Sequence, residues 1–442
     1  MRCTIVLFLL VFAAQCFGAP RATSGNQSEI QAAIDAASAG ATVTIPVGRW
    51  TWTDTLRVNK AVTLSGETGA VILNGHNVGV LIEVSAPATV QGLSIEQASG
   101  TTPDWSVKHL VVSAAGTLIT GCNFSMASHG ARMIEWEVNG GVITQCTFTS
   151  TQKADTSGIG FKALGLTNTW TQSSSIGMAG DPNGTKNTYL EDSTFKDVFL
   201  QALDFDDNSR TVVRHCVFDN SGATSHGADT SPSGVRQVEM YDNEFIFTIG
   251  GNCTSNPYPL NLNYWFYVRG GIGVICDNVM PSISSCAWGD KSSISLTVYN
   301  IRRAGGQVPC QTKYPALHQI GQGPEGTTDP LYIWGNTGSG ATKVGLVNYN
   351  PDECGNNLAV SDFLREGRDY VLSARPNYQK YTYPHPLAAG GKPQPSATPS
   401  PSATPTPIPA PTPTPPTGTT YRTWLDQLAG WIHDHAPVPD TP

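Results

Sequence analysis

The sequence predicts an all-β solenoid, a parallel β-helix, and three observations lead to this fold class. One short phrase recurs along the chain, as LITGCNF, VITQCTF, TYLEDSTF, VVRHCVF and VEMYDNEF. The Phe residues that close these phrases are separated by 24, 47, 23 and 27 residues, and a period of about two dozen residues is typical of solenoids. Apolar and polar residues alternate within each phrase, which predicts short strands with one face turned inward. A single phrase cannot bury that face, whereas stacked coils can.

The closing Phe residues, called marker residues below, are expected to stack in one column inside the solenoid: Phe124, Phe148, Phe195, Phe218 and Phe245. The 47-residue interval is interpreted as two coils, the second without a marker and with longer loops. Three cysteines stand two residues before a marker and are expected to stack as small apolar side chains: Cys122, Cys146 and Cys216. Five others are candidates for disulfides of open pairing: Cys253, Cys276, Cys286, Cys310 and Cys354.

The start of the chain has the pattern of an export signal over residues 1–19. Arg2 precedes an apolar run from Ile5 to Phe12, and small residues follow at Gly18 and Ala19. The run is shorter than the roughly 20 residues that span a membrane, and no other stretch is apolar enough. We therefore expect a protein without a transmembrane segment that is secreted, and either free or attached at a cell surface.

A short amphipathic helix is expected to cover the open end of the first coil. Ser28 and Gln31 match an S-x-x-Q capping box, and Gly40 is expected to end the helix. Its apolar side consists of Ile30, Ala33, Ile34 and Ala37. Such a cap would protect strand edges that otherwise promote aggregation.

The rest of the chain divides by composition. Residues 20–387 are expected to form the β-helix domain, whose last segment is an extended strap because its prolines lack the N–H donors that regular strands need. Residues 388–420 form a stiff Pro/Thr-rich linker. Residues 421–442 are a short amphipathic helix and tail, and the two Trp residues on one face of it favour docking on a cell-surface component or a protein partner.

The entry into the coils resembles a known family. A helix followed by ATVTIPVG and TLRVNKAVTLSGE is similar to the start of right-handed parallel β-helix proteins of the pectate-lyase-like superfamily. The segments SHGADTSPSGVRQVEMYDNEF and YTYPHPL resemble a secreted subgroup of these proteins. The resemblance extends to about Leu387. It implies a right-handed β-helix that handles carbohydrate on its outer face.

The catalytic motifs of that superfamily are matched in part. Polygalacturonase-like members carry Asn-Thr-Asp, Asp-Asp, Gly-His-Gly and Arg-x-Lys on successive coils. Here Asp206-Asp207 and His226-Gly227 resemble the middle two motifs, although Ser225 replaces the first Gly. Neither outer motif is evident, and neither are the Arg or Lys signatures of the pectate lyases. The resemblance therefore implies a carbohydrate-related function and does not fix the reaction.

An acidic strip is predicted on the outside of the coils. Counting from the markers places Glu135, Asp206 and Asp229 at one position of different coils. Alternation turns Leu203 and Phe205 inward, so that their acidic neighbours project outward. The strip comprises Glu135, Glu137, Asp204, Asp206, Asp207 and Asp229, with Arg132 and His226 nearby. It is open to three interpretations: a Ca²⁺ site through Asp204, Asp206 and Asp229, an acid and base pair for a glycosidic bond, or an ordinary solvated face.

Candidate roles follow from residue chemistry. An imidazole with a pKa near 6.5 suits proton transfer, and arginines suit binding of a substrate carboxylate or, by the resemblance to β-helix lyases, the role of base. The catalytic candidates are Asp204, Asp206, Asp207, His226, Asp229, Arg236 and Arg269. The substrate-binding candidates are Trp265, Tyr267, Arg132 and Glu135, the first two because sugar rings stack on flat aromatic surfaces.

The net charge of −8 argues against a nucleic-acid partner, which would need a basic stripe. The function predicted from the sequence is therefore a secreted, carbohydrate-active β-helix that cleaves a polysaccharide as a lyase or glycoside hydrolase in an outer groove. The alternative is a non-catalytic glycan-binding or cell-surface adhesion protein, which the incomplete motifs favour. Apart from Ca²⁺, no cofactor is expected.

Overall fold

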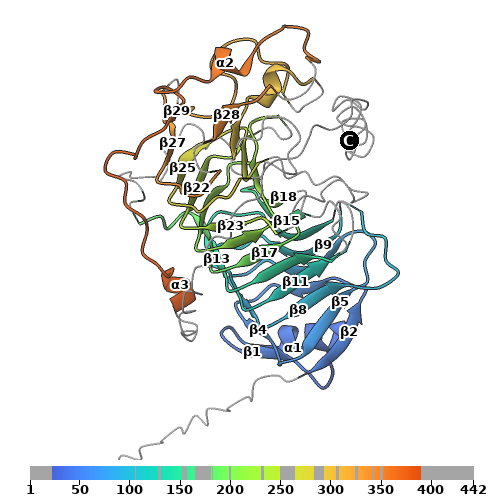
Figure 1. The fold of residues 1–442 in the computed structure, drawn as a ribbon. Helices are drawn as coiled ribbons and strands as arrows, with labels where there is room; N and C mark the ends of the chain where they lie inside the picture. Colours follow the sequence, from blue (N-terminus) through green and yellow to red (C-terminus); the bar gives the residue numbers. More distant parts are fainter. Residues whose placement is uncertain are drawn as a thin grey trace, which may run out of the picture.

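The computed structural model describes residues 22–389, except for residues 105, 128–130, 152–156, 165–180, 182, 199–200, 230–232, 249–263, 283–292, 305–307, 324–326, 341–342 and 349–351. Over this range the chain winds into a right-handed parallel β-helix, as predicted (Figure 1). The predicted signal segment, the linker from residue 390 onward and the C-terminal helix lie outside the described residues. Within the described part, no helix is both long and apolar enough to cross a membrane.

Three sheets of parallel strands form the sides of the helix, and each coil contributes about one strand to each sheet. Sheet A contains β1 (Thr42–Ile45), β4 (Thr63–Gly66), β7 (Thr89–Gln91), β10 (Leu118–Thr120), β13 (Gly141–Thr144), β16 (Thr188–Glu191), β19 (Arg210–Arg214), β22 (Gln237–Tyr241), β25 (Ile272–Cys276), β27 (Leu331–Trp334) and β29 (Tyr370–Val371). Sheet B contains β2 (Gly48–Trp52), β5 (Ala70–Asn74), β8 (Ser94–Gln97), β11 (Asn123–Met126), β14 (Thr147–Ser150), β17 (Thr194–Lys196), β20 (Val217–Asp219) and β23 (Glu244–Ile246). Sheet C contains β3 (Leu56–Val58), β6 (Val80–Val84), β9 (Lys108–Val112), β12 (Arg132–Trp136), β15 (Ser157–Phe161), β18 (Gln201–Phe205), β21 (Ala223–Ser225), β24 (Phe266–Val268), β26 (Ile294–Leu296) and β28 (Val344–Leu346).

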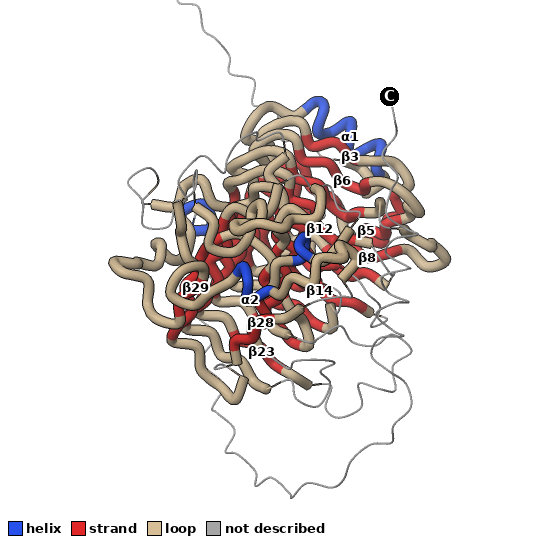
Figure 2. Tube along the Cα trace, turned by 90° about the horizontal axis from the view of Figure 1, so that it is seen from above, coloured by secondary structure: helices blue, strands red, loops and turns tan. Residues whose placement is uncertain are grey.

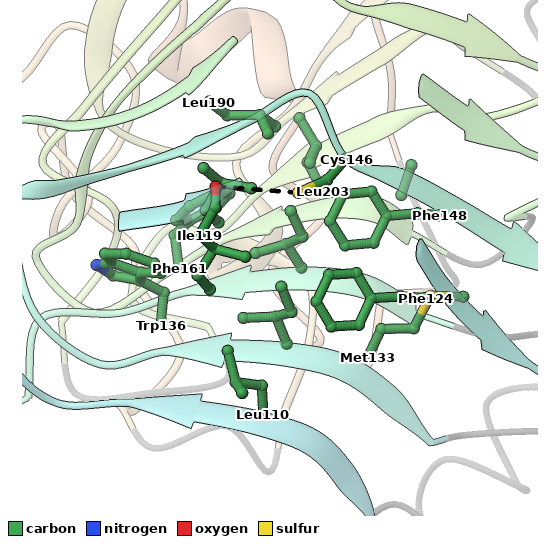
Figure 3. Close-up of a cluster of buried hydrophobic side chains, with 14 of the residues drawn as sticks. Leu110, Ile119, Phe124, Met133, Trp136, Cys146, Phe148, Phe161, Leu190 and Leu203 are labelled. Atoms are coloured by element: carbon green, nitrogen blue, oxygen red, sulfur yellow. Dashed lines mark hydrogen bonds between the residues drawn. The ribbon is translucent and has the colours of Figure 1, made fainter. Parts of the chain in front are cut away.

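The markers form the predicted column inside the helix. From Phe124 to Phe245, successive rings stack nearly parallel with their centroids 4.6 to 5.1 Å apart. Figure 3 shows the first two rings, Phe124 and Phe148, one above the other. The thiols two residues before three of the markers are buried beside this column, as predicted: Cys122, Cys146 and Cys216. The repeated phrase therefore encodes the continuous core of the solenoid.

The interpretation of the 47-residue interval as two coils was wrong. Phe148 on β14 pairs directly with Phe195 on β17, so the interval is a single coil. β15 belongs to the same coil and lies in sheet C. The spacing alone could not show this, because loops between strands lengthen without changing which strands stack.

The predicted cap is present, but its first turn differs from the prediction. Helix α1 (Gln27–Ala36) buries Ile30, Ala33 and Ile34 against the first coil. Asn26 is its N-cap and makes no side-chain capping bond, so the capping box predicted at Ser28 was wrong. The carboxylate of Glu29 instead accepts a hydrogen bond from the N–H of Ser24 at 2.9 Å.

The later coils are less regular and are held in part by one disulfide. Cys310 is bonded to Cys354, and Cys276 is a buried thiol, while Cys253 and Cys286 lie outside the described residues. The short helices here are η3 (Tyr299–Ile301), α2 (Val360–Phe363) and α3 (Pro386–Ala389). Figure 2 shows that loops, rather than helices, connect most of the strands. Residues 372–389, called the strap, run back along the outside of sheet A (Figure 1, orange), as the sequence predicted.

Candidate active site

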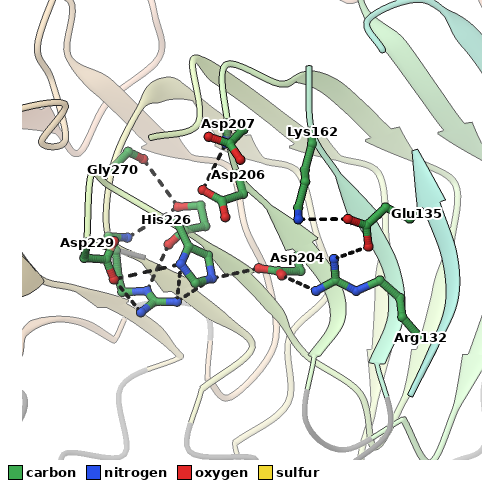
Figure 4. Close-up of polar contacts among 11 residues, drawn as sticks. Arg132, Glu135, Lys162, Asp204, Asp206, Asp207, His226, Asp229 and Gly270 are labelled. Atoms are coloured by element: carbon green, nitrogen blue, oxygen red, sulfur yellow. Dashed lines mark hydrogen bonds and ion pairs between the residues drawn. The ribbon is translucent and has the colours of Figure 1, made fainter. Parts of the chain in front are cut away.

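The predicted acidic strip lies on the outer face of sheet C. Leu203 and Phe205 of β18 are buried in the core, and this turns Asp204 and Asp206 to the opposite face of the strand, as predicted. Strand pairing extends this face over β12, β15, β18, β21 and β24. Charged side chains from coils that are far apart in the sequence thus become neighbours (Figure 4).

The register of the strip differs from the predicted alignment. Glu135 pairs with Gly160, which pairs with Asp204, so Asp204 rather than Asp206 shares a row with Glu135. The counting failed because the turns between the markers and sheet C differ in length. A second row of side chains is formed by the residue that directly follows the last paired residue of each strand. It consists of Glu137, Lys162, Asp206, His226 and Arg269.

The carboxylates of the strip are ion-paired. Arg132 bridges two of them, with Nη1 2.9 Å from Glu135 Oε2 and Nη2 2.6 Å from Asp204 Oδ2. Lys162 Nζ lies 2.8 Å from the other oxygen of Glu135. In Figure 4 the side chains of Arg132 and Lys162 converge on Glu135 from two sides. Like charges stacked on adjacent coils are therefore separated by cations, which removes most of the expected repulsion.

His226 continues this network towards the later coils. Its Nε2 lies 2.8 Å from Asp204 Oδ1, and Nη2 of Arg269 lies 2.8 Å from its Nδ1 and 2.5 Å from its Nε2. Arg269 is in turn ion-paired with Asp229, at 2.7 Å between Nη1 and Oδ2. When the ring is neutral, Arg269 donates only to the ring nitrogen that carries no proton. Both ring nitrogens are thus engaged by protein groups.

In each of these ion pairs the cation is the more exposed partner. The side chain of Lys162 is 26% exposed and that of Arg132 is 13% exposed, against 7% for both Glu135 and Asp204. Arg269 is 8% exposed and Asp229 is 2% exposed. The acids of these pairs, called the inner acids below, therefore lie closer to the strands than their cations do, whereas Glu137 and Asp207 of the strip are partly exposed.

The inner acids are held ionised. Burial alone would raise the pKa of Glu135, but Arg132 and Lys162 more than reverse this effect, and Lys108 adds to theirs, so that the pKa falls to about 2. Burial opposes ionisation of Asp204 in the same way, and His226 and Arg132 hold its pKa well below the ordinary value. Neither carboxyl can carry a proton near neutral pH, so neither can act as a general acid there.

Three other groups of the second row have shifted pKa values. Burial and Arg269 disfavour protonation of His226, but Asp204 and Asp206 outweigh them and raise its pKa. Burial would lower the pKa of Lys162, yet Glu135 raises it overall. Burial, aided by Glu135, raises the pKa of the Glu137 carboxyl. The site therefore keeps Lys162 charged and gives His226 more proton affinity than a free imidazole.

The three predicted calcium ligands do not gather as a cation site would require. The two oxygens of Asp204 face Arg132 and His226, and Oδ2 of Asp229 faces Arg269. One oxygen of Asp206 accepts the N–H of Asp207 at 2.9 Å. No group of three or more potential ligand side chains occurs among the described residues. As arranged here these carboxylates do not offer the several free oxygen ligands that Ca²⁺ needs. Binding of Ca²⁺ itself stays an untested prediction.

Two predicted site residues lie elsewhere. Trp265 is fully buried in the core, where its ring packs 5.2 Å from Phe245 and its Nε1 donates to Pro281 O, so its prediction as a sugar-stacking surface was wrong. Arg236 is also fully buried, and its pKa is lowered to about 10 by burial and by Arg210. It directly precedes β22 of sheet A, where Arg210 and Asp329 are its charged neighbours.

The aromatic group that does reach the site is a tyrosine pair. Tyr267 stacks on Tyr264 with ring centroids 4.7 Å apart, and the guanidinium of Arg269 lies 5.4 Å from the ring of Tyr267. Tyr267 is only 5% exposed, so it contributes mainly to holding Arg269. Residues two apart on a strand share a face, so alternation does not separate these two aromatic residues. Trp265 lies just before β24 and enters the core, whereas Tyr267 is in the outward row of Asp204.

Lys162 is the functional candidate that the sequence reasoning missed. It directly follows the core residue Phe161, just as Asp206 follows Phe205 and Glu137 follows Trp136. That shared position was the available signal. It was overlooked because the coil of Phe161 was assigned a wrong place in the stack.

Comparison with known proteins gives similarity in structure alone. No family model matches the chain, and no curated protein sequence is similar to it. A PL6 family polysaccharide lyase from Pseudopedobacter saltans is 12% identical, with a TM-score of 0.47 over 85% of this chain and 90% of that one. An alginate lyase from a Paenibacillus species is 10% identical, with a TM-score of 0.41 over 74% and 98%. PfbA, a surface adhesin of Streptococcus pneumoniae, is 13% identical, with a TM-score of 0.38 over 63% and 80%.

Proposed function

We propose that the protein cleaves an acidic polysaccharide, one whose sugar units carry carboxylates, by β-elimination on the outer face of sheet C. The observation that supports this most directly is the layering of charge, because Lys162 and Arg132 lie above the acids to which they are paired. A ligand that approaches this face meets cations first. An anionic chain is the ligand that such a surface attracts.

The protonation states favour elimination over hydrolysis. Hydrolysis of a glycosidic bond uses one protonated carboxyl and one ionised carboxylate, whereas Glu135 and Asp204 are both held ionised. Elimination needs a base that removes the proton beside the sugar carboxylate and an acid that protonates the leaving oxygen. The C–O bond breaks as the C=C bond forms. Cations that bind the carboxylate make that proton easier to remove.

We assign the roles as follows. Lys162 and Arg132 bind the sugar carboxylate, because they are the most exposed cations of the network. His226 is the proton carrier, since an imidazole suits proton transfer and the carboxylates of Asp204 and Asp206 raise its pKa. Its Nδ1 faces Arg269 in the free protein, and a substrate carboxylate is the natural competitor for that guanidinium. Asp204 orients the ring through Nε2 and is a positioning residue.

A second candidate reaction is glycoside hydrolysis, and one observation supports it. The pKa of Glu137 is raised by burial and by Glu135, as a general acid requires. In that reaction Glu137 would protonate the leaving oxygen and an ionised neighbour would activate water. The two reactions differ in their products, because only elimination leaves an unsaturated sugar end.

We also propose that the protein acts outside the cytoplasm. The pattern of residues 1–19 supports export. The Cys310–Cys354 disulfide is independent support, because such bonds persist in oxidising compartments.

The test is a cleavage screen with the full-length protein on acidic and neutral polysaccharides. We expect cleavage of an acidic chain with a rise in ultraviolet absorbance from unsaturated ends. Lys162→Gln and His226→Gln should each lower the rate at least a hundredfold, because each removes a group that acts in the reaction. Arg49→Gln is the matched control, since Arg49 is an exposed cation on sheet B paired with Glu96 at 2.8 Å.

Each outcome of the screen separates the alternatives. New reducing ends without ultraviolet absorbance, lost in Glu137→Gln, would replace elimination by hydrolysis. Binding of an acidic glycan without cleavage would support the non-catalytic alternative. Cleavage that survives both Lys162→Gln and His226→Gln would move the active site away from sheet C.

A further inference from the structure

The strap docks on sheet A through side chains that are three or four residues apart. Along residues 372–389 five side chains are partly buried while all the others are exposed: Arg375, Tyr378, Tyr381, His385 and Ala388. The strap also has local main-chain hydrogen bonds, from Tyr378 N–H to Arg375 O and, in α3, from Ala388 N–H and Ala389 N–H to His385 O. These bonds lie within the strap, so its attachment to sheet A depends on its other contacts with the coils.

The first group of contacts is centred on a buried ion pair. Arg214 and Glu191 are fully buried and paired at 2.8 Å. Arg214 also donates to the carbonyl oxygens of Tyr381 and Thr382 at 2.9 and 2.8 Å, and the N–H of His385 donates to Glu191 at 3.0 Å. This first group therefore binds the main chain of the strap, and its acid, Glu191, is in direct contact with a cation.

The second group of contacts is centred on a buried acid, Glu239, that has only neutral donors. Its carboxylate accepts hydrogen bonds from the hydroxyls of Tyr378 and Tyr381 at 2.6 and 3.0 Å, and from the amide of Gln237 at 2.7 Å. The two tyrosines belong to the strap, so this second group binds side chains of the strap. Docking of the strap is what removes this carboxyl from water.

We propose that the strap is a releasable clamp whose hold on sheet A depends on the protonation of Glu239, so that the clamp is tighter in mildly acidic than in alkaline conditions. The two groups of contacts differ in charge. Glu191 is in contact with the cation Arg214, whereas all three hydrogen-bond donors at Glu239 are neutral. Because residues 390–442 follow the strap directly, its release lengthens their tether by 18 residues, roughly 55 Å at about 3.1 Å per residue.

The direction of the pKa shift agrees with this geometry. Burial raises the pKa of Glu239 to about 7, although Tyr378, Tyr381 and Gln237 each lower it by hydrogen bonding. Release returns the carboxyl to water and to an ordinary, lower pKa. The docked state is therefore favoured when the carboxyl is protonated, and that advantage is lost as the pH rises through about 7.

Other titratable groups face Glu239 or lie under the strap, and a test must separate their contribution to the pH dependence of strap release from that of Glu239. Around Glu239 they are Tyr189, Tyr241, Tyr378, Tyr381 and Arg375, the last of which is paired with Asp329. Burial raises the pKa of Glu191, with the same sign as for Glu239. Burial lowers the pKa of His215 and His385, with the opposite sign. Lys380 is paired with Asp242 and Asp277.

The experiment compares hydrogen exchange of a strap amide in the full chain and in Glu239→Gln, which is an isostere of the protonated acid. The probe is the N–H group of His385, which donates to Glu191 of sheet A in the docked state. The ratio of opening constants between the two proteins cancels the contribution of the histidines and of Glu191. That ratio should rise about tenfold between pH 6 and pH 8.5.

Two results would overturn the clamp. A ratio that stays constant with pH would show that Glu239 does not control opening. If Glu239→Gln fails to fold, the carbon-13 titration of the Glu239 carboxyl in the wild-type chain decides instead. A midpoint near 7 supports the proposal, and a midpoint near that of a free glutamate contradicts it.

Discussion

The outer faces of sheets A and C bury charge in two different ways. On sheet C each inner acid is paired with a cation that remains partly exposed, and the described residues leave Lys162 accessible. On sheet A the charges lie beneath the strap, where Arg214 and Glu191 are completely buried and Glu239 has neutral partners. The same stacking of parallel strands thus supports a surface that is open to ligand on sheet C and a set of charges covered by the strap on sheet A.

The difference indicates what buried charge does in each place. A network with cations outermost keeps its acids ionised over a wide pH range and offers positive charge to solvent. A covered acid without a contacting cation is instead sensitive to pH. The predictions below test this contrast by removing matched groups from the two faces.

The largest effect is expected for Arg214→Met on sheet A. The change leaves the buried Glu191 without its cation and frees two strap carbonyls, so we expect a loss of about 3–5 kcal/mol in the free energy of unfolding. Chemical denaturation at neutral pH measures it.

The matched change on sheet C is Arg132→Met. Here Glu135 keeps Lys162 and Asp204 keeps His226, so the expected loss is only about 1–2 kcal/mol. Equal losses for the two variants would contradict the contrast between the faces.

An intermediate effect is expected on acidification, and it arises on sheet C. The pKa of Glu135 is lowered to about 2, so the folded state loses stability as the pH falls from the ordinary glutamate range towards that value. The expected contribution is about 2–3 kcal/mol between pH 6 and pH 2.5, measured by denaturant unfolding at both pH values. This sign is opposite to that of Glu239.

Glu135→Gln should remove this contribution, so that the free energy of unfolding falls less between pH 6 and pH 2.5, the range called the acid limb below. Glu96→Gln is the control, because Glu96 is an exposed acid paired with Arg49 on sheet B. An acid limb that is unchanged in Glu135→Gln, or equally flattened in Glu96→Gln, would show that the sheet C network does not hold its acids ionised.

Much of the fold was predictable because each coil repeats one packing problem. The marker column from Phe124 to Phe245, the cap α1 and the strap all followed from apolar spacing or from proline content. The outward direction of Asp204 and Asp206 followed from strand alternation. These features depend only on local sequence.

The candidate site was predictable only in part, because it depends on register between coils. Turn lengths moved Asp204 rather than Asp206 into the row of Glu135, and they hid Lys162. Trp265 failed for another reason, because it precedes β24 and does not follow the alternation of that strand, so that its ring enters the core. The partners of His226 could not be predicted either, because Asp204 and Arg269 come from other coils. Removal of His226 deprives Asp204 and Arg269 of contacts and must cost stability.

The smallest effect is expected for Lys380→Ala, on the exposed side of the strap. Lys380 lies 2.7 Å from both Asp242 and Asp277, but its side chain is 34% exposed, and pairs of this kind contribute less than about 1 kcal/mol. Global unfolding should therefore hardly change. Exchange of the His385 amide, which is bonded to Glu191, should still speed up by about two- to fivefold, because the lost pair held the strap and not the coils. Asp104→Asn in a loop remote from the strap is the control and should leave that amide unchanged. A change in global stability as large as that of Arg214→Met would mean that the strap and the coils unfold as one unit, and that no separate clamp exists.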